Sequence, residues 1–341
     1  MTTAFPLSPQ PNLASKTASQ TLIKVDLVKG ELAPPYRSYN HWLQEQFGGR
    51  VAKISVDPGF TCPNMDGTKG VGGCTFCDET GSSSRVPIKT ESITEQILKT
   101  LPKMQDRFNT HRFIAYFQPR TNTYAPVAKL KAVYDEALAA HPDIMGLAIS
   151  TRPDCVDEEK LALIASYQQP GRLVSIEYGL QSIHNRSLAA VNRCETVEDF
   201  ETAYALTQQY GIDHCIHVIL GLPGESWEDM MATANQLAAW RVAGVKIHLL
   251  VAMNKTMLAK DFEAGRWAPM ERNTYIHTVC DFIERLHPEC VIHRVAGNGH
   301  PLHVLAPRWM TEKFDVMSDI DAEFSRRGTR QGSHCNTFFT K

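Results

Sequence analysis

The stretch Asp57-Pro-Gly-Phe-Thr-Cys62-Pro-Asn-Met-Asp-Gly-Thr-Lys-Gly-Val-Gly-Gly-Cys74-Thr-Phe-Cys77 follows a β-rich run and holds three cysteines and five glycines. Glycine-rich backbone can fold closely around a ligand, and thiolate is the ligand that iron–sulfur clusters use. Three cysteines leave one iron of a four-iron cube without a protein ligand, and an open coordination position is typical of a catalytic metal centre. The loop therefore favours an iron–sulfur cluster.

Strand-like and helix-like segments alternate around this loop. Ala125–Ala140 carries apolar residues at helical spacing. Thr196–Tyr210 and Ser226–Trp240 each open with a hydroxyl residue followed three positions later by aspartate, which resembles a capping box. Strands alternating with helices at intervals of roughly 30 residues predict parallel βα units. The expected strands are Val51–Asp57, Arg112–Phe117, Ile144–Ser150, Leu173–Tyr178, Cys215–Leu220 and Val245–Val251.

Six such units fall short of the eight that close a barrel, so we expect an α/β fold with a partial (β/α)6 barrel. Residues 1–35, rich in Ser, Thr, Pro, Gln and Ala, predict a mobile N-terminal tail. Residues 36–285 are expected to form the barrel core. Residues 286–341 are expected to form a short C-terminal α/β extension with a strand at Glu289–Val295, a helix at Thr311–Arg326 and a loose end.

The composition is that of a soluble globular protein, with 43% hydrophobic and 21% charged residues in 341. No apolar run approaches the ~20 residues of a membrane helix, and the N-terminus lacks the apolar segment of a secretory signal. Nine cysteines, odd in number and mostly scattered, do not indicate a disulfide framework. We therefore expect a reducing, cytoplasmic location and no membrane partner.

The overall charge does not indicate a dedicated nucleic-acid binder. The net charge is −2 and the isoelectric point is near 6.7, whereas such proteins are usually basic. A local patch can still bind RNA. Arg326, Arg327 and Arg330 form a late basic cluster, which is either a solvated helix end or an RNA contact.

A zinc site is the competing interpretation of the cysteine loop. Cys74-x-x-Cys77 has zinc-ribbon spacing, and Cys62 could supply a third thiolate. A fourth ligand would come from elsewhere, such as Cys155 or a histidine, because the chain has no second C-x-x-C.

Further motifs accompany the loop along the chain: Tyr39-Asn40-His41-Trp42, Ala115-Tyr116-Phe117-Gln118, Thr121-Asn122-Thr123, Ser150-Thr151-Arg152-Pro153-Asp154, Glu177-Tyr178-Gly179-Leu180-Gln181, Gly221-Leu222-Pro223-Gly224-Glu225, Lys246-Ile247-His248-Leu249-Leu250 and His293-Arg294. Together they resemble the radical S-adenosylmethionine (SAM) superfamily over roughly residues 36–332. The usual cluster motif there is C-x3-C-x2-C, whereas eleven residues separate the first two cysteines here. Longer first spacings occur in a subgroup that contains the radical SAM subunit of Elongator and bacterial proteins close to it.

The resemblance implies that Cys62, Cys74 and Cys77 hold a 4Fe–4S cluster whose open iron binds SAM. Reduction of the cluster then cleaves SAM to a 5′-deoxyadenosyl radical, so the cofactors supply the difficult chemistry. It also implies that Gln181 and Arg193 bind SAM, and arginine is suited to clamping a carboxylate.

Further SAM contacts are implied at Asn122, Ser150, Glu177 and Gly221, which fall at the carboxyl ends of predicted strands, where ligands gather in parallel α/β folds. Two of these depart from the family pattern. Asn122 stands where relatives often have a run of glycines, and Ser150 stands where many have an acid. Gly221 lies in a region that approaches the adenine in the family, and glycine permits that approach.

The likeness to the Elongator subunit implies a tRNA substrate, namely the C5 side chain of a wobble uridine, for example by trimming of a carboxymethylaminomethyl group. A flavodoxin- or ferredoxin-type protein is expected as the electron donor. Lys246 and Arg294 are candidates for contacts with an anionic substrate, and His248 is either a core residue or a catalyst. Three alternatives remain: a radical SAM enzyme for a small-molecule or protein substrate, a zinc-stabilised nucleic-acid-binding module, and an iron–sulfur electron carrier or sensor.

Overall fold

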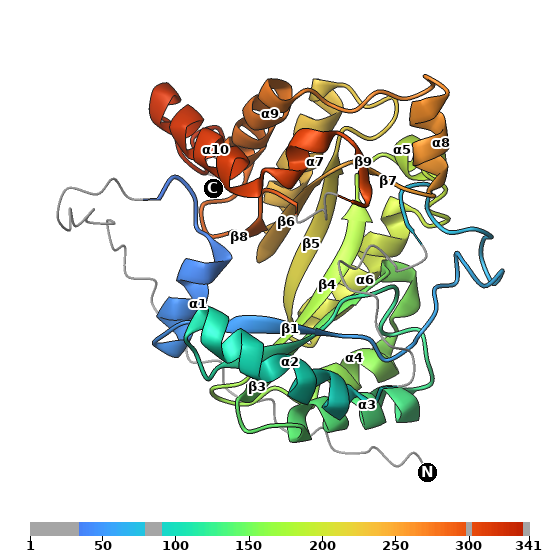
Figure 1. Ribbon diagram of the computed structural model, residues 1–341, viewed down its shortest axis with the longest axis vertical. Helices are drawn as coiled ribbons and strands as arrows, with labels where there is room; N and C mark the ends of the chain where they lie inside the picture. The colour runs from blue at the N-terminus through green and yellow to red at the C-terminus, as the bar shows by residue number, and fades with distance from the viewer. Residues whose placement is uncertain (1–33, 79–90, 298–301, 337–341) are drawn as a thin grey trace, which may run out of the picture. The chain divides into compact units, whose positions relative to one another are not determined.

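Seven parallel strands form one curled sheet in the order β1-β2-β3-β4-β5-β6-β8 (Figure 1). The computed structural model describes residues 34–78, 91–297 and 302–336. The two edge strands, β1 and β8, do not pair with each other, so the barrel is partial, as predicted. The strands are β1 (Ala52–Val56), β2 (Phe113–Phe117), β3 (Ile144–Thr151), β4 (Leu173–Gln181), β5 (Asp213–Leu220), β6 (Gly244–Leu249) and β8 (Val291–Arg294).

Helices follow the strands and pack on the outer face of the sheet, where α2 contacts β1, α3 contacts β3 and α6 contacts β4. A short antiparallel pair, β7 (Ala252–Met253) with β9 (Val304–Ala306), lies apart from the main sheet. The helices are α1 (Tyr39–Phe47), α2 (Ile93–Phe108), α3 (Val127–Ala139), α4 (Glu158–Ala165), α5 (Asn185–Ala190), α6 (Val197–Gln209), α7 (Trp227–Trp240), α8 (Met257–Glu263), α9 (Arg272–Arg285) and α10 (Lys313–Arg327), with 3-10 turns η1 (Pro153–Cys155) and η2 (Arg308–Thr311).

Strand β4 explains how the sheet separates a packed face from a functional face. Successive side chains on a strand point to opposite sides. Val174, Ile176, Tyr178 and Leu180 belong to the main hydrophobic core between the sheet and the outer helices. Glu177 and the other residues at alternate positions of β4 point inward, so the sheet presents buried polar side chains to the inside of the half-barrel.

Helix α1 covers part of the inner face near the amino ends of the strands. Leu43 packs with Val51, Ile114, Tyr116 and other residues in a separate apolar cluster, and α1 also contacts β8. A serine side chain begins the helix, since the Ser38 hydroxyl accepts from the His41 amide. The half-barrel is thus filled with apolar side chains at this end.

The first and last described segments of the chain meet beside β8. The Gln331 amide donates to the Pro35 carbonyl at 2.9 Å, and the Arg37 amide donates to the Gln331 side-chain oxygen at 2.9 Å. The Ile292 amide in β8 donates to the Arg37 carbonyl at 2.8 Å. These bonds form a latch, which we define as Pro35, Arg37 and Gln331 against β8.

All six predicted barrel strands are present, and both predicted capping boxes are confirmed at Thr196 and Ser226. The strand expected at Glu289–Val295 is β8, which joins the barrel sheet as its seventh strand although it lies beyond residue 285. The expectation of a loose end is wrong for residues 328–336, because the buried Gln331 side chain donates to the Cys290 carbonyl at 2.7 Å. The predicted tail at residues 1–35 lies almost entirely outside the described residues.

No helix within the described ranges is both long enough and apolar enough to span a lipid bilayer.

Candidate active site

The cysteine loop leaves the end of β1 and is held against the segment that follows α5. The Gly73 amide donates to the Asn64 carbonyl at 2.8 Å, and the Asn192 side chain donates to the Gly73 carbonyl at 2.8 Å. A Cβ atom on Gly70 would lie 2.1 Å from the Asn64 side-chain oxygen, so this close approach requires glycine. The loop therefore has a defined shape despite its glycine content.

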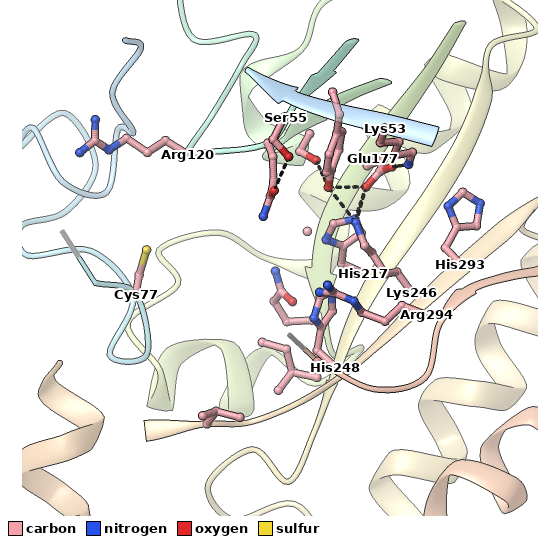
Figure 2. A pocket seen from close by; sticks show the side chains of 18 of the residues that line it. Lys53, Ser55, Cys77, Arg120, Glu177, His217, Lys246, His248, His293 and Arg294 are labelled. Carbon is pink, nitrogen blue, oxygen red and sulfur yellow. Dashed lines mark hydrogen bonds and ion pairs between the residues drawn. The ribbon is translucent and has the colours of Figure 1, made fainter. Parts of the chain in front are cut away.

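A cavity of about 780 Å³ is lined by all three cysteines of this loop and by the inner face of the sheet (Figure 2). Cys74 is buried, whereas Cys62 and Cys77 are half-buried. The lining side chains from the sheet include Lys53, Tyr116, Glu177, His217, Lys246 and Arg294. With Ser150 of β3 also in the lining, the cysteine loop and all seven strands of the sheet contribute to one site.

The sulfur of Cys74 has two nitrogen donors beside it. Arg193 Nη1 lies 3.7 Å away and Asn64 Nδ2 lies 3.6 Å away. A neighbouring cation stabilises the thiolate form of cysteine, which is the form that binds iron. Three thiols on one cavity, with donors beside the buried thiol, fit a four-iron cluster with one iron left free of protein ligands.

The zinc alternative requires a compact set of ligands around one ion. Within residues 34–78, 91–297 and 302–336, no group of three or more His, Cys, Asp or Glu side chains is arranged to hold a metal ion. Cys155, considered above as a fourth ligand, is buried, and burial together with Asp154 raises the pKa of its thiol. The absence of such a group includes Cys62, Cys74 and Cys77 themselves, so it bears equally on a zinc ion and on an iron–sulfur cluster.

Arg193 belongs to a buried ionic network that connects β4 to the cysteine loop. Its Nη2 donates to the Gly179 carbonyl at 2.7 Å, and its Nε pairs with Glu195. Arg152 lies on the other side of Glu195, at 3.1 Å, and pairs with Asp154 at 2.7 Å. Arg193 is therefore held beside Cys74 by contacts within the protein.

The structure gathers four of the six predicted SAM-binding residues around the cavity: Ser150, Glu177, Gln181 and Arg193. Asn122 is not among the lining residues. Its buried amide donates to three backbone carbonyls at and just after the ends of β2 and β3, which ties these strands together. Gly221 is also absent from the lining. It adopts a φ of +82°, and a Cβ atom there would contact Met270.

Glu177 is the centre of a buried polar cluster, which we define as Lys53, Tyr116, Glu177, His217 and Lys246 (Figure 2). One carboxylate oxygen is 2.5 Å from the Lys53 ammonium, and the other is 2.8 Å from Lys246, 2.8 Å from His217 and 2.9 Å from the Tyr116 hydroxyl. This cluster could not be expected from the sequence, because its members come from five different strands. The one sign of the cluster in the sequence is that charged residues stand inside strands that are otherwise apolar.

The charges of the polar cluster depend on one another. Burial opposes ionisation of Glu177, but Lys246, Lys53 and His217 outweigh it and hold the pKa of the carboxyl well below its usual range. Burial and the neighbouring Lys246 lower the pKa of His217 to about 4, so this imidazole is neutral at pH 7. Burial lowers the pKa of Lys246 as well.

Arg294 and His248 lie beside the polar cluster and also line the cavity. In Figure 2 the Arg294 side chain points into the cavity from β8. It makes no hydrogen bond or ion pair with any residue of the described ranges. The Nε2 atom of His248 is buried without a hydrogen-bond partner there. Both side chains thus present unsatisfied nitrogen atoms.

The basic cluster noted near the C-terminus is partly neutralised. Arg326 pairs with Glu323 at 2.7 Å, and Arg327 pairs with Asp281 at 2.6 Å. Arg330 is exposed on the surface. Two of the three arginines are therefore engaged in ion pairs within the chain.

The chain is similar in sequence to known proteins over most of its length. A family profile described as the radical SAM superfamily matches residues 67–237, and one described as the Radical_SAM C-terminal domain matches residues 242–326. The uncharacterized protein YtqA of Bacillus subtilis is 36% identical over 297 residues, which are 87% of this chain and 92% of that protein.

Two further similarities concern larger proteins. The fold is similar to that of the archaeal Methanocaldococcus infernus Elp3 lacking its N-terminus, with a TM-score of 0.62 and 17% identity over 82% of this chain and 64% of that chain. The tRNA uridine(34) acetyltransferase of Dehalococcoides mccartyi is 25% identical over 154 residues, which are 44% of this chain and 33% of that protein. The present chain matches less than two thirds of either.

Proposed function

Because this chain belongs to the radical SAM superfamily, we propose that Cys62, Cys74 and Cys77 hold the 4Fe–4S cluster of the enzyme. The cluster and SAM, when bound, supply a 5′-deoxyadenosyl radical. The observation that carries the assignment is that all three cysteines line the same cavity as the polar residues of the sheet. The protein's part is to bind, orient and enclose the reactants.

Gln181 and Arg193 are the proposed SAM contacts, since both line the cavity and Arg193 is fixed next to Cys74. Ser150 is a further candidate, and its hydroxyl donates to Tyr116 at 3.0 Å. The carboxylate of Glu177 has four partners already, which assigns it to shaping the cavity. Asn122 and Gly221 are proposed to support the site without lining the cavity. Asn122 ties the ends of β2 and β3 together, and Gly221 forms the turn after β5.

The proposed substrate is a tRNA, at the C5 side chain of a wobble uridine. The partial likeness to a tRNA uridine(34) acetyltransferase and the fold shared with Elp3 support this choice. Among the residues that the structure describes, the cavity is lined by eight lysine and arginine side chains and by two carboxylates, and two of the arginines, Arg152 and Arg193, are also paired with the buried acids Asp154 and Glu195. An excess of positive charge attracts an anionic polymer, and a nucleotide flipped out of a loop can enter such a pocket.

A reductant is required by radical SAM enzymes, and we propose a flavodoxin- or ferredoxin-type protein as the electron donor. The test of the substrate is nucleoside profiling of bulk tRNA from a strain that lacks the gene. The C5 side chain of wobble uridine is expected to change in the deletion strain and to be restored by the wild-type gene but not by a Cys77→Ala variant. An unchanged wobble-uridine profile, with SAM cleavage intact in the purified enzyme, would direct the search to another substrate class.

A further inference from the structure

The Arg294 guanidinium is a cation for which the described chain provides no counter-ion. It is half-buried, it lines the cavity, and its neighbour across the β6–β8 pairing is another cation, Lys246. Guanidinium nitrogens are donors that carboxylates and phosphates satisfy in pairs. An unpaired cation inside a cavity is costly unless a ligand completes it.

The carboxylate of the polar cluster, Glu177, does not serve as the counter-ion of Arg294. Glu177 accepts from two lysines, a histidine and a tyrosine, and each of its oxygens is therefore occupied. His248, one position along the inner face from Lys246, adds a second unsatisfied nitrogen. Arg294 and His248 thus place unsatisfied nitrogen atoms on the side of the cavity formed by β6 and β8.

We propose that Arg294, assisted by His248, binds a carboxylate carried by the reacting side chain of the substrate. This inference rests on the proposed function and refines it, because a carboxymethylaminomethyl group on uridine ends in such a carboxylate. Figure 2 shows Cys77 and Arg294 on different sides of the cavity. A side chain anchored at Arg294 would extend its preceding carbons toward the cysteine loop.

A side-chain carboxylate suits this position better than a backbone phosphate. A phosphate of RNA is flanked by a ribose on each side, so it reaches Arg294 only if the polymer threads through the half-barrel. A flipped nucleoside presents its C5 side chain as a single narrow group. The inner-face position of Arg294 on β8 therefore favours the terminal group of a side chain.

Binding of anticodon stem-loop RNA to the reconstituted enzyme tests the inference without turnover. Three RNAs are compared, with carboxymethylaminomethyl-uridine, aminomethyl-uridine or unmodified uridine at the wobble position. Arg294→Gln is expected to weaken binding of the carboxylated RNA by about 10- to 100-fold and to leave the other two RNAs nearly unchanged. Arg294→Lys retains the charge but not the paired donors of the guanidinium. Its affinity for the carboxylated RNA is expected to lie between those of wild type and Arg294→Gln.

The control variant is Arg172→Gln, which removes an arginine before β4, at the end of the sheet opposite the cysteine loop. This variant is expected to change the affinity for the three RNAs by the same factor. An equal loss for all three RNAs in Arg294→Gln would assign the residue to backbone phosphate. A weaker affinity for SAM, with RNA binding unchanged, would assign it to the cofactor. Either result overturns the proposal.

A small-molecule arm separates this inference from the tRNA proposal. N-methylglycine carries the same carboxymethylamine group, and methylamine lacks the carboxylate. Calorimetry at millimolar concentration is expected to detect N-methylglycine but not methylamine with the wild-type enzyme, and neither compound with Arg294→Gln. If RNA fails to bind but this pattern holds, the tRNA proposal fails and the carboxylate site stands. If Arg294→Gln and wild type bind N-methylglycine equally, the carboxylate site fails.

Discussion

At the scale of single residues, Arg193 connects the cysteine loop to the sheet. Its three guanidinium nitrogens contact Cys74, Gly179 and Glu195, and the side chain is only 8% exposed. Arg193 therefore has a structural role, and any contact that it makes with a cofactor is additional to this role. A loss of activity on its replacement therefore needs a stability measurement beside it.

Replacing Arg193 by glutamine leaves Glu195 buried without its closest partner. Removal of one member of a buried ion pair costs about 3 kcal/mol, so the free energy of unfolding of the apoprotein should fall by about that amount in anaerobic urea titrations. Adding Glu195→Gln removes the buried acid that is left with Arg152 as its remaining partner, and should recover part of the loss. The exposed Arg186→Gln, which also breaks an arginine–aspartate pair, should change stability little. Equal stability of Arg193→Gln and wild type would contradict the network.

Cysteine replacements test the cluster assignment directly. Cys77→Ala removes one of three thiolate ligands, so anaerobic reconstitution with iron and sulfide should give no stable brown chromophore and no 5′-deoxyadenosine with dithionite and SAM. Cys280→Ala is the matched control, because this buried thiol has a pKa raised to about 12 by burial and does not line the cavity. Full cluster content in Cys77→Ala, or its loss in Cys280→Ala, would speak against the assignment.

The sequence was informative about residues that are close in the chain and silent about those that are not. Cys62, Cys74 and Cys77 share one loop, so their common role could be expected from spacing and glycine content. Lys53 and Lys246 meet at Glu177 only because β1, β4 and β6 lie in one curled sheet. Their meeting depends on curvature, which the local pattern does not encode.

At the scale of secondary structure, side-chain caps fix where several helices begin. Ser226 accepts from the Asp229 amide, and the Asp229 carboxylate accepts from the Ser226 amide. Ser226→Ala removes one side of this reciprocal pair and should lower the free energy of unfolding by about 1 kcal/mol, measured by chemical denaturation. The control Ser325→Ala lies on the exposed face of α10 and should be neutral, because alanine favours a helix interior. A similar loss in both variants would mean that the cap itself contributes nothing.

Helix prediction succeeded where apolar spacing and a cap agreed, as at Thr196–Tyr210. It missed α2, although Ser92 and Glu95 form a capping box at its start, because Pro102 lies inside the helix and proline normally breaks a helix. It missed α9, which has no side-chain cap, although it found α3 and α10, which lack one too. Apolar spacing was therefore the stronger signal, and a cap by itself neither identified a helix nor was needed for one.

At the scale of the whole molecule, buried histidines make stability depend on pH. Burial and Lys246 lower the pKa of His217 to about 4, while in the unfolded chain it is about 6.5. Between these values the unfolded state binds a proton that the folded state does not, so acid favours unfolding. The free energy of unfolding of wild type should therefore fall by up to about 3 kcal/mol more than that of His217→Gln between pH 6.5 and pH 4. Parallel pH profiles of the two proteins would show that His217 is not held neutral.

The alternation of strands and helices in the sequence predicts the open parallel architecture. It does not predict that β8 joins the sheet or that α1 covers the inner face. The sequence supports a division at residues 35 and 285, which we retain as a proposal about domain boundaries. In the fold, β8 completes the sheet, and α1 covers its inner face. Contacts between distant parts of the chain decide both features, and no periodic signal in one segment records them.

The latch beside β8 has a consequence for biosynthesis. A ribosome releases Pro35 and Arg37 early, yet their partner Gln331 lies 294 positions after Arg37 in the chain. Domains begin to fold from the amino end during translation, so most of the sheet can assemble while this seam is still unsealed. The nascent half-barrel therefore passes through a stage in which the cysteine loop already exists while the β8 side is still unlatched.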